Sequence, residues 1–498
     1  MRVLVLVVLL LVGAPMARAA EVVGVTSAEG WLIYGAKTSF AREAGPPGGG
    51  AVVVEATETA DPWSSGAAAV FNGAVKAGET YTAVFWLQAP TSAKISALLL
   101  TNAPPYPTFA RTELVGAGDW KRITITGVAK ADAAPVQDAL TLHLGRAGEP
   151  VRLGPAIILR GAPSEAELVA IEKAYKPAGR AEDVAFTASD GAVLAGTLRT
   201  PSGKGGFPAV LMLGGSGVQV RGGFTRLQER LLAAGIATLE YDKRGCGQSG
   251  GERIETIPRL AADAEAAVAF LRARPDIDPS RIVVLGSSQG GMVAPAVALQ
   301  DKRLRGVVMQ VAPAVVGAQV VGDQVARQLV MQWPRGGSYA DQRRFVDGLL
   351  AIVKSTSDPA VRRARISQAV GDAVKAERIP PDAAESIVAG LTDVAASSVL
   401  DYRPAEVLRR LKGPALLIYG TKDVMVSAVQ NAPVARAALR GNPQARVVVL
   451  EGLNHFLQRP RTDDLEEWRT LGGGMSDPEA MNLIVGWIEA TVGARPPV

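Results

Sequence analysis

The stretch RIVVLGSSQGGMVAPAVALQ, residues 281–300, contains the most informative pattern in the chain. An apolar run that is typical of a strand ends at residue 287, and a helical pattern follows over residues 292–300. Gly286, Ser288 and Gly290 form G-x-S-x-G between them, whereas Ser287 is out of frame. Glycines suit a sharp strand-to-helix turn because a Cβ there would collide with the adjoining backbone. The pattern therefore predicts Ser288 as a nucleophile at such a turn.

Apolar runs on both sides of this motif alternate with helical patterns, such as the one at residues 257–276. Runs that are apolar throughout are typical of strands covered on both faces. We therefore expect a doubly wound α/β sheet within residues 183–498. Its expected strands cover residues 209–215, 235–242, 281–287, 306–313, 415–420 and 446–452.

Residues 314–401 interrupt this alternation with several amphipathic helical patterns and no convincing strand pattern. Phe345, Leu349, Ile352 and Val353 recur at helical spacing on one face. An insertion between sheet strands is a candidate lid over the strand ends. The alternative is a helical addition packed on the side of the sheet.

The chain contains two histidines, and a nucleophilic serine requires a base. His143 lies in the predicted strand ALTLHLG, where a structural or surface role is favoured. His455 follows the last apolar strand, in LEGLNHF. We therefore expect His455 to be the base of a serine mechanism.

A carboxylate should orient the imidazole and stabilise its cation. Asp423 lies three residues beyond Gly420, at the end of the strand ALLIYG. Glu451 and Asp401 are the fallback carboxylates. The chain order of serine, aspartate and histidine is that of α/β-hydrolases rather than that of the two protease classes.

Acyl transfer also requires N–H donors for the tetrahedral oxyanion. The backbone N–H of Gln289, directly after the nucleophile, is one candidate. Ser216, in the loop GGSG that follows the strand AVLML, is the other. A phosphate-binding loop is the alternative for this glycine-rich segment, but neither the P-loop nor the dinucleotide pattern occurs at this place. We expect no cofactor and no metal.

Residues 1–19 have the pattern of a secretory signal peptide, with Arg2, an apolar run over residues 3–12, and Ala17 and Ala19 at the cleavage-site spacing. We expect a periplasmic or secreted protein. The apolar run is about half of the roughly 20 residues that a membrane span requires. No cysteine follows the leader, so no lipid anchor is expected. Cys246 is the single cysteine, which excludes an intrachain disulfide.

Residues 20–160 contain short alternating runs separated by turns, which predicts an antiparallel β-sandwich. Its clearest strands cover residues 78–89, 119–129, 139–145 and 151–159. A linker over residues 161–182 follows, in which Ser164 can cap a short helix that ends before Pro177.

The order of these N-terminal segments resembles the jelly-roll carbohydrate-binding and galactose-binding-like modules. The segments from residue 180 onward resemble the secreted bacterial α/β-hydrolase family of esterases and acyl hydrolases, with relatives among dienelactone hydrolases and acyl-CoA thioesterases. Besides the serine motif, YDKRGCGQSGG (residues 241–251), the run that leads to Asp423, and LEGLNHFLQ carry this resemblance. It implies that the turn with Asp242 and Arg244 is structural. The loop GGSGVQVRGG departs from the family's usual oxyanion sequences, which leaves the acyl and leaving-group preference open.

The composition, 48% hydrophobic and 20% charged residues with a net charge of +5, is typical of a globular protein and does not point to nucleic acid. The principal hypothesis is a serine hydrolase that cleaves carboxylic esters, with esterified glycans as a candidate substrate class. Amide, peptide and thioester hydrolysis are the alternatives within the same chemistry. A further alternative is a glycan-binding protein whose β-sandwich is the working part. Trp31, Trp63, Trp86 and Trp120 supply its aromatic surfaces, and Trp63, in the turn-rich DPWSSG, is the candidate contact.

Overall fold

The computed structural model divides the chain into two compact units, Met1–Lys176 and Pro177–Val498. The boundary falls inside the linker that the sequence predicts. The predicted signal peptide, residues 1–19, lies outside the described residues. The structure describes residues 20–34, 36–41, 50–56, 61–71, 74–101, 106–133, 138–174, 179–392, 399–460 and 477–493.

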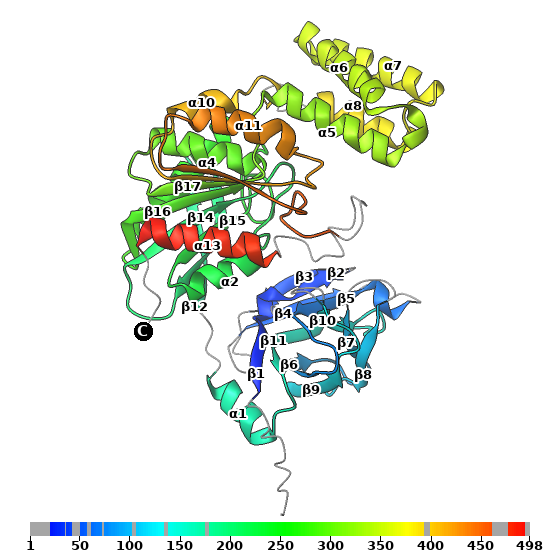
Figure 1. Ribbon diagram of the computed structural model, residues 1–498, viewed down its shortest axis with the longest axis vertical. Coiled ribbons are helices and arrows are strands. Elements are labelled where there is room, and N and C mark those ends of the chain that lie inside the picture. Colours follow the sequence, from blue (N-terminus) through cyan, green and yellow to red (C-terminus); the bar gives the residue numbers. More distant parts are fainter. Residues whose placement is uncertain are drawn as a thin grey trace, which may run out of the picture. The chain divides into compact units, whose positions relative to one another are not determined.

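The first unit consists of two antiparallel sheets (Figure 1). One sheet has the order β3-β4-β11-β6-β9, with β1 beside β11, and the other has the order β2-β5-β10-β7-β8. Phe85 and Leu153 from the first sheet and Leu99 and Leu140 from the second belong to one buried cluster, so the sheets pack face to face. The prediction of a β domain ahead of the α/β sheet is confirmed. Its strands are β1 (Glu21–Thr26), β2 (Leu32–Tyr34), β3 (Ala36–Ala41), β4 (Ala51–Ala56), β5 (Gly66–Val70), β6 (Thr80–Gln88), β7 (Lys94–Thr101), β8 (Thr108–Val115), β9 (Lys121–Val128), β10 (Asp138–His143) and β11 (Val151–Arg160).

The linker contains helix α1 (Glu165–Ala174), which packs on this β domain. Ser164 and Glu167 form a reciprocal capping pair: Ser164 N–H donates to the Glu167 carboxylate at 2.8 Å, and Glu167 N–H donates to Ser164 Oγ at 3.3 Å. Leu168 joins a buried cluster with Trp86. Part of the predicted linker therefore belongs structurally to the first unit.

The second unit contains an eight-stranded sheet of order β12-β13-β15-β14-β16-β17-β18-β19. The six strands from β15 to β19 in this order are parallel, and β12 and β13 extend the sheet as antiparallel strands. The predicted doubly wound sheet is confirmed. Its strands are β12 (Gly179–Thr187), β13 (Val193–Pro201), β14 (Phe207–Leu213), β15 (Ala237–Tyr241), β16 (Ile277–Ser287), β17 (Gly306–Gln310), β18 (Ala415–Gly420) and β19 (Ala445–Leu450).

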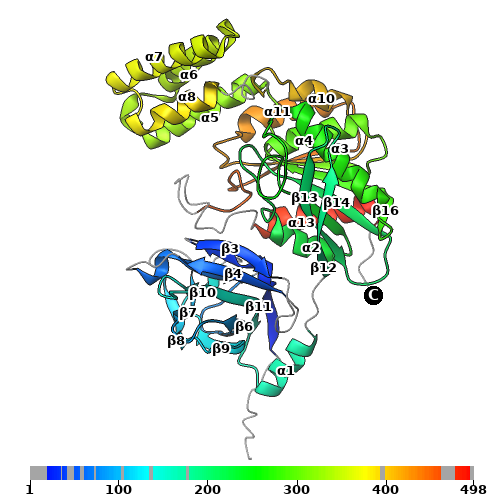
Figure 2. The same cartoon turned by 180° about the vertical axis from the view of Figure 1, so that it is seen from behind.

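Alternate residues of the central strands point to opposite faces of this sheet, as the two-residue period of a strand requires. On β14, Leu211 belongs to the cluster that contains α3 and α4, whereas Val210 and Met212 belong to the cluster that contains α2 and α13. The views from the front and from behind show these helices covering the two faces (Figures 1 and 2). The covering helices are α2 (Thr225–Ala233), α3 (Ile257–Ala273), α4 (Gln289–Gln300), α10 (Pro404–Arg410), α11 (Ala428–Leu439) and α13 (Pro478–Val492).

The predicted insertion is helical, and the described residues between 314 and 401 contain no strand. Its helices gather in one group and share a buried cluster of their own (Figure 1). Leu349 and Val353 are buried in this cluster, and Phe345 and Ile352 pack against it. The insertion comprises α5 (Gly317–Gln332), α6 (Tyr339–Ser355), α7 (Pro359–Lys375) and α8 (Ala384–Thr392). The described part of the chain contains no helix with both the length and the apolar composition of a membrane span.

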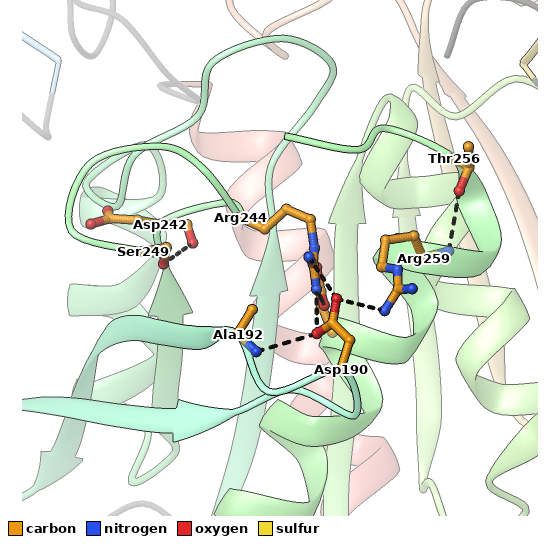
Figure 3. A network of polar contacts seen from close by, with 8 residues as sticks. Asp190, Ala192, Asp242, Arg244, Ser249, Thr256 and Arg259 are labelled. Atoms are coloured by element: carbon orange, nitrogen blue, oxygen red, sulfur yellow. Dashed lines mark hydrogen bonds and ion pairs between the residues drawn. The ribbon is translucent and has the colours of Figure 1, made fainter. Parts of the chain in front are cut away.

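A buried arginine holds the turn that follows β15 (Figure 3). Arg244 donates to the Asp263 carboxylate at 2.6 and 2.8 Å and to the Asp190 carboxylate at 3.0 and 3.2 Å. Arg259 reaches the same Asp190 at 3.0 Å. Arg244 is the main cause that lowers the pKa of Asp190 to about 2. This charge network fixes the backbone at the carboxyl edge of the sheet.

Candidate active site

Ser288 connects β16 to α4 in a strained conformation, with φ 54° and ψ −115°. Its N–H donates to the carbonyl of Gln310 at 2.8 Å. A Cβ on Gly286 would overlap the carbonyl of Gly290, and a Cβ on Gly290 would overlap the carbonyl of Leu213. The two glycines of the motif are therefore required by close backbone approach, and the surrounding structure has to hold the strained serine.

His455 and Asp423 are hydrogen-bonded at the same edge of the sheet. Asp423 follows β18, and His455 lies in the turn after β19. His455 Nδ1 and Asp423 Oδ2 are 2.9 Å apart, and the two side chains are 9% and 0% exposed. The other carboxylate oxygen of Asp423 accepts the N–H groups of Met425 and Val426, both at 2.8 Å. A carboxylate beside Nδ1 favours the tautomer with the proton on that nitrogen, which leaves Nε2 for another partner.

The fallback carboxylates lie elsewhere. Asp401 is exposed and pairs with Lys354 at 3.8 Å. Glu451 is also exposed. Of the three carboxylates considered from the sequence, Asp423 is the one that binds His455.

Ser288 and His455 line one cavity of about 620 Å³ together with Ser216 and Gln289. Helices α5 and α8 supply much of its remaining wall, mainly with apolar side chains such as Val325 and Leu391. The helical insertion therefore forms a wall of the cavity that contains the candidate nucleophile. A cavity of this size is typical of a small-molecule site.

The two candidate oxyanion donors reach this cavity from separate segments. Gln289 is the first residue of α4, where a backbone N–H has no partner within the helix. Ser216 lies in the loop after β14, and a Cβ placed on the neighbouring Gly215 would lie 3.5 Å from Ser288 Cβ. The glycine loop therefore runs directly against the candidate nucleophile.

Lys243, which the sequence pattern does not single out, is a buried lysine behind this loop. Its Nζ donates to the carbonyl of Gly215 at 2.7 Å and to Gln289 Oε1 at 2.8 Å. It also lies 3.4 Å from Glu255 Oε2, which accepts the N–H of Gly217 at 2.9 Å. Burial lowers the pKa of Lys243, and Glu255 partly opposes that effect. The family-like sequence YDKRG could have drawn attention to this lysine, but a single basic residue after a strand does not reveal its partners.

The other residues singled out from the sequence lie in the first unit. His143, in β10, is half-buried, and burial is the main cause that lowers its pKa. Trp63 lies in a short 3₁₀ helix, Pro62–Ser64, and is 59% exposed, whereas Trp31 and Trp86 are buried. Within the described residues, no group of three or more His, Cys, Asp or Glu side chains could hold a metal ion.

Comparisons with known proteins identify relatives of this chain. The chain is 28% identical to the esterase EstD of Thermotoga maritima over 272 residues, which are 53% of this chain and 58% of that protein. It is 35% identical to the quorum-quenching protein AidA of Acinetobacter baumannii over 130 residues, 26% of this chain and 42% of that protein. The chain thus spans about half the length of the curated relatives it matches.

A solved structure of the Pyrococcus furiosus esterase Pf2001 matches with 18% identity and a TM-score of 0.42, over 67% of this chain and 97% of that one. The model of the alpha/beta hydrolase family matches residues 210–468, just over half of the chain. That range contains the turn of Ser288, the bonded pair of Asp423 and His455, and the helical insertion between them. The chain therefore belongs to the alpha/beta hydrolase family.

Proposed function

We propose that this protein hydrolyses carboxylic esters through an acyl-enzyme formed on Ser288. One observation carries the proposal: a serine held at φ 54° in a strand-to-helix turn shares a cavity with a histidine whose Nδ1 is bound to a buried aspartate. A nucleophile, a base and an orienting carboxylate are the three parts of a serine acyl-transfer site.

In the proposed reaction, His455 Nε2 takes the proton of Ser288 as Oγ attacks the ester carbonyl carbon. Asp423 holds the imidazole in the required tautomer and stabilises its cation. The backbone N–H groups of Ser216 and Gln289 stabilise the oxyanion, each contributing about 3 kcal/mol. Collapse of the tetrahedral intermediate expels the alcohol, which receives the proton from His455. Water then attacks the acyl-enzyme by the same steps and regenerates Ser288, without metal or cofactor.

The leaving group distinguishes an esterase from its alternatives, because the same triad can attack esters, thioesters and amides. The similarity to a protein named as an esterase supports the ester. The predicted signal peptide argues against acyl-CoA, which is scarce outside the cytoplasm. A panel of matched p-nitrophenyl esters, thioesters and anilides with one acyl group measures the preference. A higher kcat/KM for the anilide than for the ester would make the protein an amidase.

Ser288→Ala tests the mechanism within the same panel. We expect loss of nearly all turnover, because the nucleophile and its base act as a unit. Ser287→Ala is the matched control, since it removes the neighbouring hydroxyl and should leave kcat unchanged. Ester hydrolysis at the wild-type rate by folded Ser288→Ala protein would refute the proposal.

A second candidate function concerns the first unit, for which we propose glycan binding through Trp63. The exposed ring of Trp63 supports glycan binding, because flat aromatic faces stack on sugar rings. Trp31 and Trp86 are buried and belong to the core. The alternative is a domain that only packs on another domain or on another copy. Affinity electrophoresis of the full-length Ser288→Ala protein in gels with xylan, pectin or β-glucan distinguishes glycan binding from a packing role. Retardation that Trp63→Ala abolishes supports targeting, and no retardation in any gel rejects it.

A further inference from the structure

A single buried cation binds both segments that carry the proposed oxyanion donors. Lys243 follows β15, and its ammonium group donates to the carbonyl of Gly215 at 2.7 Å and to the side-chain oxygen of Gln289 at 2.8 Å. It also contacts the carbonyl of Gly217 at 3.3 Å. Gly215 and Gly217 flank Ser216, so Lys243 binds the glycine loop on both sides of the first proposed donor. It also binds the side chain of Gln289, whose backbone N–H is the second proposed donor.

The contact with Gly215 determines where the N–H of Ser216 points. The carbonyl of Gly215 and the N–H of Ser216 belong to the same planar, trans peptide group, in which the two bonds point in opposite directions. A carbonyl directed at Lys243 therefore turns the N–H of Ser216 away from the lysine. Gly215 has no Cβ to restrict the rotation of this peptide group, so the contact with Lys243 supplies the restraint.

Glu255 fixes the next peptide of the loop. Its Oε2 accepts the N–H of Gly217 at 2.9 Å, and the carbonyl of Ser216, in the same peptide group, accepts the side-chain amide of Gln219 at 3.1 Å. Both peptide groups that include Ser216 are therefore held by side chains, those of Lys243 and Glu255 from outside the loop and that of Gln219 from within it. The ammonium group also polarises the Gly215–Ser216 amide, which strengthens its N–H as a donor.

The second donor is held in the same way. Gln289 is buried at the start of α4; its Oε1 accepts from Lys243, and its Nε2 donates to the carbonyl of Glu255 at 3.2 Å. The side chain thus anchors the residue whose backbone N–H faces the oxyanion in the proposed reaction. Lys243 and Glu255 form an ion pair at 3.4 Å, so the buried ammonium has a compensating charge.

From these contacts we infer that Lys243, paired with Glu255, is the positioning residue of the oxyanion hole. The inference rests on the proposed function, because the oxyanion exists only in acyl transfer. Lys243 acts through the backbone of Gly215 and the side chain of Gln289 rather than by touching substrate. Its loss should weaken the binding of the transition state and leave the binding of the ground-state ester almost unchanged.

Lys243→Met tests this role, because methionine keeps most of the side-chain length and removes the charge and the donors. We expect kcat to fall roughly 10–100-fold, approaching the loss of one oxyanion donor, with KM changed less than about threefold. The affinity for an alkyl boronic acid, which forms a tetrahedral adduct on serine, should fall by the same factor as kcat. If Lys243 only stabilised the fold, Lys243→Met would lower the melting temperature, but kcat and boronate affinity would not fall by the same factor.

Two further variants supply a second test of the inferred role and a control. Gln289→Met keeps the backbone donor but removes the contact with Lys243, so we expect the same signature even if Lys243→Met does not fold. Lys354→Met is the control: this lysine, 52% exposed, pairs with Asp401 at 3.8 Å on the insertion and should leave kcat and boronate affinity unchanged.

Unchanged kcat and boronate affinity in folded Lys243→Met and Gln289→Met proteins would overturn the inference, provided that activity still depends on Ser288. A rise in KM alone would also overturn it, since that result would mean that Lys243 contacts the substrate. Activity that survives Ser288→Ala would instead refute the proposed function itself.

Discussion

Replacing Arg244 with methionine removes the cation that holds the turn after β15. The side chains of Arg244 and Asp263 are each 1% exposed, and two hydrogen bonds of 2.6 and 2.8 Å join them. The variant leaves the Asp263 carboxylate buried without its cation, whereas Asp190 is 32% exposed and can be solvated. Removing one partner of a buried pair costs about 3–5 kcal/mol. That is a large share of the 5–15 kcal/mol that is typical of a folded domain.

Urea unfolding of the full-length protein, followed by circular dichroism in the helical band, measures this loss, because nearly all described helices belong to the second unit. Arg259→Met is the control. Arg259 also contacts Asp190, but it is 31% exposed, so we expect a loss of at most about 1 kcal/mol. Arg244→Met with Asp263→Leu should recover most of the stability, since no buried charge remains. A loss in Arg244→Met no larger than that in Arg259→Met would mean that the buried pair of Arg244 and Asp263 does not stabilise the fold.

Three other predictions concern the active-site base, a buried carboxylate and the cavity. Asp423→Asn should lower kcat about 10⁴-fold through the wrong imidazole tautomer, with normal folding by circular dichroism; a tenfold loss or less would contradict the assigned role. Burial raises the pKa of Glu240 from 4.5 to about 7, so the folded protein binds a proton that the unfolded chain releases, and stability falls as the pH rises through that window. Glu240→Gln should therefore match wild type near pH 4 and be more stable by up to roughly 3 kcal/mol at pH 8, in urea titrations at both pH values. Val325→Trp, on the cavity wall, should lower kcat/KM for long-chain esters more than for acetate; equal changes across chain lengths would place the acyl chain away from α5.

The sequence could predict the parts of the site that depend on local pattern. Ser288 lies in a motif of five residues between a strand and a helix, and His455 is one of only two histidines. Asp423 follows from the position of a strand end. Helix α4 begins at Gln289 rather than at residue 292, because the glycines that suggest a loop permit close packing, Gly290 against the end of β14 and Gly291 against Ala312.

The contacts of Lys243 could not be predicted, because they depend on how distant loops fold back over the sheet edge. Its partners Gly215 and Gln289 lie on different strand ends, and each is more than twenty residues away in the chain. The size of the cavity could not be predicted from local sequence either, since it depends on how α5 and α8 lie over the strand ends. Amphipathic periodicity predicts that such helices exist and which face is buried, but not what they enclose.

Covalent labelling of the wild-type protein tests whether Ser288 is the nucleophile. The wild-type protein is inhibited with a fluorophosphonate, digested, and analysed by mass spectrometry for the labelled peptide. We expect one adduct, on Ser288, formed in step with the loss of esterase activity and greatly slowed in His455→Ala. A label on Ser287 or Ser216, or full activity in protein fully labelled at Ser288, would contradict the assignment of Ser288 as the nucleophile.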